Sequence, residues 1–194
     1  PESGYGIQEI AEYLGRFPSQ DMKALSLYVL AAERGQIRSQ LRLAREFLLG
    51  NNIAPDHEKG VYWAREAADD GSSKAKVLLG MAYWKGIGVR ADAFESIRWF
   101  TSAAEQGDIC GQYNLGHIFE NSSPKYRDLS KAVALYELAS KSLPAALLKL
   151  IEFHKSGNGV TKDLDKALSL ARKGLRQGGM LDIGKSTCEG SSIS

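Results

Sequence analysis

The chain repeats itself at an interval of about 36 residues, and this periodicity limits its possible folds more than any other feature. Similar segments open at Asp56, Asp92 and Asp128, and a further copy opens at Asp163, 35 residues later. An earlier copy has Gln20 in place of the aspartate, so the second half of the unit occurs five times. A repeat of this length indicates a solenoid, in which neighbouring units stack to share one core.

The first half of the unit is predicted to form its own helix. Copies begin at Ser39, Ala75, Gly111 and Ala146, and each leads into the aspartate of the following segment. Apolar or small residues recur in these copies at helical spacing, as at Leu79, Gly80 and Tyr83. Each unit is therefore predicted to be a pair of amphipathic helices.

Glycine and aspartate mark the turns between the predicted helices. Gly86 and Gly88, like the pair at 157 and 159, can adopt the positive φ that ends a helix. The aspartate that follows is placed to cap the free N–H groups of the next helix. The fourth unit has residues 121–124, Asn-Ser-Ser-Pro, in place of the glycines, so its loop is expected to follow a different path.

Small and aromatic residues at repeated positions are interpreted as packing residues. Alanine pairs recur in the first three units, at 31–32, 67–68 and 103–104, where they let neighbouring helices approach closely. Trp63 and Trp99 share one repeat position with leucines, which favours a role in the core over a role in stacking on a ligand.

The composition is that of a folded protein with mixed surface charge. The 25 basic and 23 acidic residues are interspersed, and the formal net charge is +2. We therefore expect no nucleic acid partner and no membrane insertion, because no block of like charge and no apolar run of roughly 18 residues is present. The start at Pro1 fits either a mature end left by signal-peptide removal or a trimmed chain.

The residues that could carry chemistry do not form a recognisable catalytic or metal-binding set. His57, His117 and His154 show no metal-ligand spacing with one another or with the cysteines. Cys110 and His117 are separated by about two helical turns, roughly 10 Å along a helix axis, which is too far for direct activation of the thiol. We expect no catalysis, no metal and no cofactor.

The two cysteines leave two interpretations open. Cys110 and Cys188 are either independent thiols or the partners of one long-range disulfide. A bridge would require the C-terminal residues to reach back to the fourth unit, and in the entropic model it would restrict the unfolded chain by about 4 to 5 kcal/mol.

From about Gln20 to Gly178 the chain resembles the Sel-one-like repeat (SLR) family, a relative of the tetratricopeptide repeats, and the match is closest in the third unit. The resemblance is carried by Ala75, Leu79, Gly80, Tyr83, Gly86, Gly88, Val89 and Asp92, followed by Trp99, Phe100, Ala103, Ala104 and Gly107. It implies an all-α fold, a right-handed α/α superhelix of antiparallel helix pairs with about four to five units. It also implies a protein that binds partner proteins, has no catalytic residues, is mostly found in bacteria and often lies outside the cytoplasm.

The predicted organisation has three parts. Residues 1–19 are expected to form an N-terminal capping helix, a degenerate first half-repeat, and residues 20–178 the solenoid. Residues 179–194 are expected to be a tail, in which Met180, Leu181 and Ile183 fold back over the last helix as a cap.

The resemblance also predicts where a partner would bind. If the first helix of each unit lines the concave side, its residues that are not committed to packing project into a groove. These residues are Arg38, Leu41, Arg45, Leu48, Val77, Met81, Trp84, Lys85, Tyr113, His117, Glu120, Leu148, Glu152 and Lys155. Large adaptable side chains such as Trp84 and Met81 are typical interface anchors, and arginines can grip carboxylates. The alternative is that Trp84 covers a neighbouring helix and the charges are a solvated face.

Three functions remain open at this stage. The first is an interaction module that binds a protein or peptide in the groove, the second an immunity or inhibitor protein that neutralises a secreted toxin or enzyme. The third is an assembly factor for an envelope or secretion complex. The expected location is the bacterial periplasm after signal-peptide removal, with the cytoplasm as the alternative, and the sequence leaves the oligomeric state open.

Overall fold

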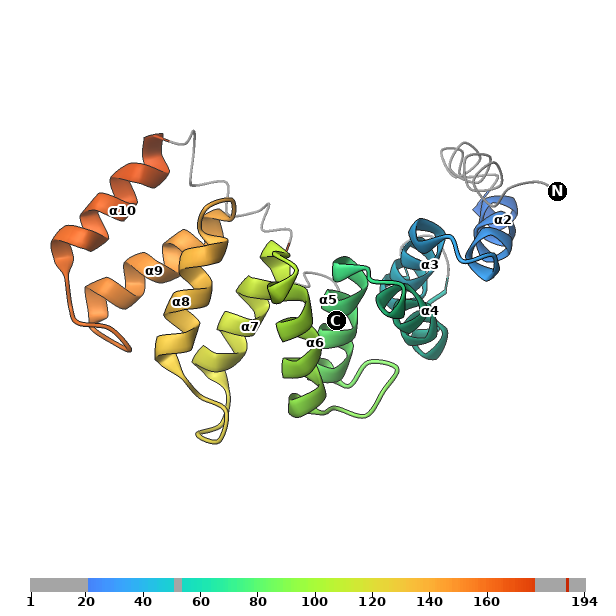
Figure 1. Cartoon of the computed structure of the whole chain (residues 1–194), viewed down its shortest axis with the longest axis horizontal. Coiled ribbons are helices and arrows are strands. Elements are labelled where there is room, and N and C mark those ends of the chain that lie inside the picture. The colour runs from blue at the N-terminus through green and yellow to red at the C-terminus, as the bar shows by residue number, and fades with distance from the viewer. Residues whose placement is uncertain (1–20, 51–53, 177–187, 189–194) are drawn as a thin grey trace. The chain divides into compact units, whose positions relative to one another are not determined.

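The structure, a computed structural model, describes residues 21–50, 54–176 and Cys188, and these form nine α-helices. The helices are α2 (Asp21–Glu33), α3 (Ile37–Leu49), α4 (His57–Asp69), α5 (Ser73–Lys85), α6 (Ala93–Glu105), α7 (Ile109–Asn121), α8 (Leu129–Ala139), α9 (Pro144–Ser156) and α10 (Leu164–Arg176) (Figure 1). The predicted alternation of first helices (α3, α5, α7 and α9) and second helices (α2, α4, α6, α8 and α10) is thus confirmed. The predicted N-terminal helix and the residues of the predicted C-terminal cap lie outside the described residues.

The chain divides into two compact units, and the division falls between Trp99 and Phe100 within α6. In the first unit α2 packs on α3, α3 on α4, and α4 on α5. In the second unit α7 packs on α8, α8 on α9, and α9 on α10. Short turns between successive helices make neighbours antiparallel, as expected of stacked helix pairs.

One aspartate per repeat joins the two helices of a pair. The carboxylates of Asp56, Asp92, Asp128 and Asp163 each accept a hydrogen bond from the backbone N–H three residues later, at 2.8–3.1 Å. The N–H of each aspartate donates to the carbonyl nine residues earlier, in Phe47, Tyr83, Phe119 and His154, at 2.8–3.0 Å. The predicted capping role is confirmed in all four copies.

The predicted glycine turns are also confirmed, and the loop without glycines in the fourth repeat changes the chain path only within that loop. Gly88 has φ +68°, and a Cβ there would collide with the carbonyl group of His57, so the turn requires glycine for two reasons. The loop at 122–127 lacks such a glycine, yet Asp128 still donates to Phe119 at 2.9 Å. The different loop therefore leaves the helix junction unchanged.

The repeated small and aromatic residues build the two hydrophobic cores. The alanine pairs at 31–32 and 67–68 and Ala103 are buried, and so is Trp63, while Trp99 is partly buried against the same core. In the second unit Tyr136 lies between Tyr113 and Phe153, with ring centroids 5.6 and 6.0 Å away. His154 is buried at the repeat position held elsewhere by an aromatic ring, and neither of its ring nitrogens has a hydrogen-bond partner among the described residues.

The aspartate junction predicts a dependence of stability on pH. The pKa of Asp128 is held below its ordinary value of 3.8, first by the backbone N–H of Lys131 and then by its side chain. Because the folded pKa is lowered, this stabilisation is complete above pH 3.8 and is lost as pH falls through the folded pKa.

We expect Asp128→Ala to lower the melting temperature at neutral pH by about 2 to 4 °C. Thermal melts between pH 7 and about pH 2.5 should show the gap to the unmodified protein narrowing below pH 3.8. Asp128→Asn keeps a capping oxygen and should lower the melting temperature less than Asp128→Ala does. A gap that is constant with pH would show that the carboxylate is not its source.

Candidate partner-binding surface

In the first compact unit, α3 and α5 are the first helices of two successive repeats, and they contact each other as well as the α4 helix between them. Six of the predicted partner-binding residues lie on these two helices and are exposed or half-buried: Arg38, Leu41, Arg45, Met81, Trp84 and Lys85. We refer to these six residues as the α3–α5 surface. The two helices contact each other within one compact unit, which makes these residues candidates for a single binding surface.

Trp84 is the aromatic residue of this surface. Its side chain is 36% exposed, although the residue before it, Tyr83, is anchored by a hydrogen bond of 2.7 Å from Arg65 on α4. Arg45 on α3 is exposed and forms no ion pair within the described part of the chain. An exposed indole can bind an apolar group, and an arginine can bind a carboxylate.

Three predicted groove residues are instead part of the core. Leu48, Val77 and Tyr113 are 1%, 8% and 3% exposed, so the prediction that they line an accessible groove is wrong. Leu48 packs on Gly60 of α4, where an added Cβ would lie 2.7 Å from the leucine Cγ. The physical reason is that each first helix has neighbours on more than one side, which narrows the strip left to solvent.

Glu120 on α7 belongs to a polar network that links three helices of the second unit. Tyr136 on α8 donates its hydroxyl to Glu120 Oε2 at 2.6 Å, and Lys149 on α9 donates to Oε1 at 3.0 Å. Burial and the hydrogen bond to Glu120 together raise the pKa of Tyr136 well above its ordinary value of 10. Both carboxylate oxygens are therefore engaged inside the protein.

Sequence reasoning missed Tyr136 and Lys149 as the partners of Glu120. A signal was present, because Glu120 stands at the repeat position of Leu48 and Trp84, so its charge departs from the pattern. Of the other predicted residues in the second unit, His117 and Leu148 are half-buried, while Glu152 and Lys155 are exposed.

The two cysteines form a disulfide, which decides between the two interpretations that the sequence left open. Cys110 on α7 is bonded to Cys188, 78 positions away, with a Cα–Cα distance of 4.9 Å. The carbonyl of Cys188 accepts a hydrogen bond of 3.2 Å from the Asn114 side chain. Cys188 is 4% exposed and shares the buried cluster of Tyr113, so it covers part of α7 that was predicted to face the groove.

The described residues contain no group of three or more His, Cys, Asp or Glu side chains that could hold a metal ion. The sulfur of Cys110 is bonded to Cys188, so it is not available to His117 as a thiol. No helix among the described residues has the length and apolar character that a membrane span requires.

Comparison with known proteins identifies the repeat. A family model described as Sel1 repeat matches residues 11–36, 37–72, 73–108, 111–142 and 144–179. The chain belongs to the Sel1 repeat family. Sel1 repeats form non-catalytic scaffolds that generally mediate protein–protein interaction, and the predicted helical solenoid of about five repeats is confirmed.

Similar proteins come from bacteria. The chain is 32% identical over 156 residues to the Sel1-repeat-containing protein YjcO of Escherichia coli K12, covering 77% of this chain. It spans 65% of the length of that relative.

Crystal structures of similar proteins share the fold. One is c5321, a protective antigen of uropathogenic Escherichia coli that displays an SLR fold, with a TM-score of 0.82 and 26% identity. That match covers 90% of this chain and 38% of the antigen. Another is a Sel1 repeat protein of Oxalobacter formigenes, with a TM-score of 0.71 and 27% identity, covering 80% of this chain and 62% of that protein.

Removal of Glu120 tests whether this residue is structural. We expect Glu120→Ala to lower the free energy of unfolding by about 1 to 3 kcal/mol, because it leaves the buried Tyr136 hydroxyl and the Lys149 ammonium without their acceptor. Glu152→Ala, at an exposed position, is the control and should change the free energy of unfolding by less than about 0.5 kcal/mol. Denaturant unfolding measures both, and equal effects would contradict the structural role.

The disulfide predicts the thiol content of the protein. Unfolded without reductant, the chain should show no titratable thiol, and after reduction it should show two. Cys188→Ser should lower the melting temperature, since the entropic model places the stabilisation from so long a loop at about 4 to 5 kcal/mol. Two thiols titrated before reduction would reject the bridge.

Proposed function

We propose that this chain is a non-catalytic scaffold that binds one protein partner through the α3–α5 surface. The observation that carries the proposal is the exposure of Trp84, 36%, on a face where Arg45 has no ion pair in the described part of the chain. Large side chains of this kind are enriched among residues that dominate binding energy. The general role of Sel1 repeats in protein–protein interaction supports this class of function.

The composition of the surface favours a particular kind of partner segment. Arg45 offers positive charge that is not used in an ion pair among the described residues, while Leu41, Met81 and Trp84 offer apolar contact. A segment that carries carboxylates beside a large apolar side chain would satisfy both sets. Met81 can adapt its shape to such a side chain because its thioether chain is flexible.

We further propose that the protein works in an oxidising compartment, the bacterial periplasm or another part of the envelope. The disulfide between Cys110 and Cys188 supports this location, because such bonds persist in secreted and periplasmic proteins and are rare in the cytosol. The nature of the partner then decides between a plain adaptor, an inhibitor of a toxin or enzyme, and a factor in envelope or secretion assembly.

The test begins by finding the partner at this surface. A photo-crosslinking residue in place of Arg45, introduced in the native bacterium, should capture a protein that the same residue in place of Tyr62 does not capture. Tyr62 lies on α4 and is 54% exposed, so it is a matched accessible position.

The purified partner then allows an affinity measurement. Trp84→Ala should weaken binding at least about tenfold with little change in melting temperature, whereas Tyr62→Ala should leave the affinity unchanged. A large loss of melting temperature with unchanged affinity would assign Trp84 to packing and contradict the proposal. Equal capture from positions 45 and 62 would contradict it as well.

A further inference from the structure

The last described helix leaves open a face that its counterparts in earlier repeats bury. Counted from the repeat aspartate, Leu168 on α10 corresponds to Val61 on α4 and Val133 on α8. The two valines are each 6% exposed, whereas Leu168 is 55% exposed. The difference arises because the helix that follows each valine-bearing helix packs on it: α5 packs on α4, and α9 packs on α8. The helix that packs on α10 is α9, which precedes it in the chain.

A second position shows the same contrast. Leu175 corresponds to Ala68 and Ser140, which are 3% and 8% exposed, and Leu175 itself is 61% exposed. With 3.6 residues per turn, Leu164, Leu168, Ala171 and Leu175 form one stripe along α10. We call these four residues the stacking face, because the counterparts of Leu168 and Leu175 are buried in the repeats of α4 and α8.

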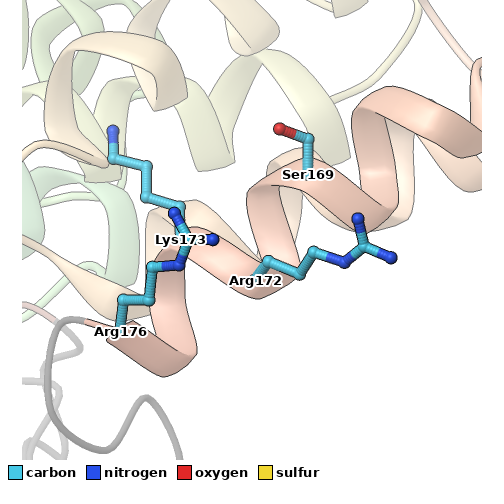
Figure 2. A pocket seen from close by; sticks show the side chains of 4 residues that line it. All are labelled: Ser169, Arg172, Lys173 and Arg176. Carbon is cyan, nitrogen blue, oxygen red and sulfur yellow. The ribbon is translucent and has the colours of Figure 1, made fainter.

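A row of cations runs beside the stacking face. Arg172, Lys173 and Arg176 form no ion pair within the described residues, and with Ser169 they line a pocket of about 330 Å³. Figure 2 shows the four side chains projecting from successive turns of α10. By helical geometry Arg172 and Arg176 lie next to the stripe, and Ser169 and Lys173 lie further round. We call these four residues the basic edge.

We propose that the stacking face and basic edge of α10 together bind an acidic amphipathic helix of a partner protein. The occupant is inferred to be a helix because helices cover the equivalent positions of α4 and α8. It is inferred to be acidic because it would lie beside Arg172 and Arg176, the two cations next to the stripe, so carboxylates at its border would pair with them. This surface is separate from the α3–α5 surface and does not depend on the function proposed for it.

A second copy of the chain and a membrane surface fit less well. Two copies that met through this face about a twofold axis would bring Arg172 and Arg176 of one against those of the other, which is unfavourable. An anionic bilayer could attract the cations, yet it would not reproduce the helix that covers each equivalent face. Both remain outcomes of the test, and so does the predicted C-terminal cap of Met180, Leu181 and Ile183, which would cover the same helix and exclude the acidic peptide.

The probe is a peptide based on the sequence of α9, the helix that covers the equivalent face of α8. Residues 144–156 with Lys149→Glu and Lys155→Glu give an acidic version, and the same residues with Glu152→Lys give a basic version. Fluorescence anisotropy of the labelled peptides with the full chain should show at least about tenfold tighter binding of the acidic peptide.

Variants assign this binding to the proposed face. Leu168→Ser with Leu175→Ser should weaken acidic-peptide binding at least about tenfold, while Leu138→Ser, at a 48% exposed leucine of α8, should not. Arg172→Glu with Arg176→Glu should reverse the preference toward the basic peptide. Melting temperatures close to that of the unmodified chain would confirm that these exposed substitutions leave the fold intact.

Any one of four results would overturn the proposal. The first two are equal affinity for the two peptides and an affinity for the acidic peptide that the leucine changes do not alter. The other two are a dimer in sedimentation that Leu168→Ser converts to monomer, and binding to vesicles rich in anionic lipid without binding to the acidic peptide.

Discussion

Each helix pair depends on a single aspartate that makes two bonds in opposite directions. Its carboxylate caps the helix that follows, and its N–H donates to a carbonyl near the end of the helix that precedes, as Asp92 does between Glu95 and Tyr83. The two bonds set where one helix stops and the next begins. The small residues can then bring the helices close, and Gly111 shows how closely, since a Cβ there would lie 2.7 Å from that of Ala103.

Because the repeated residues are committed to this scaffold, distinctive chemistry lies where the repeats differ. One repeat position holds Leu48, Trp84 and Glu120 in successive repeats, and each of the three side chains has a different environment. Leu48 is buried on α4, Trp84 is exposed, and Glu120 is bonded by Tyr136 and Lys149. The same place in the fold thus serves packing, a candidate interface and a polar network, and the residue type decides which.

The scaffold could be predicted from the sequence because its causes are local. The cap at Asp56 and the turn at Gly86 depend on residues of the same loop and the helices that flank it, and repetition makes them visible. The accessible surface could not be predicted as well, because burial of Val77 or Tyr113 depends on how several helices meet around one side chain. The pairing of Cys110 with Cys188 depends on the path of a long stretch of chain, which spacing alone leaves open.

The disulfide closes α7, α8, α9 and α10 into one covalent ring that runs from Cys110 to Cys188. A linear repeat array under tension can unravel one unit at a time, because each unit contacts only its neighbours. Inside the ring, a pull on the chain passes from one sulfur to the other and the four helices between them carry none of the load. Machines that unfold proteins by threading a single extended strand would meet two strands and a crosslink here. Resistance to such threading is therefore governed by the redox state of one bond rather than by the stability of the helices that it encloses.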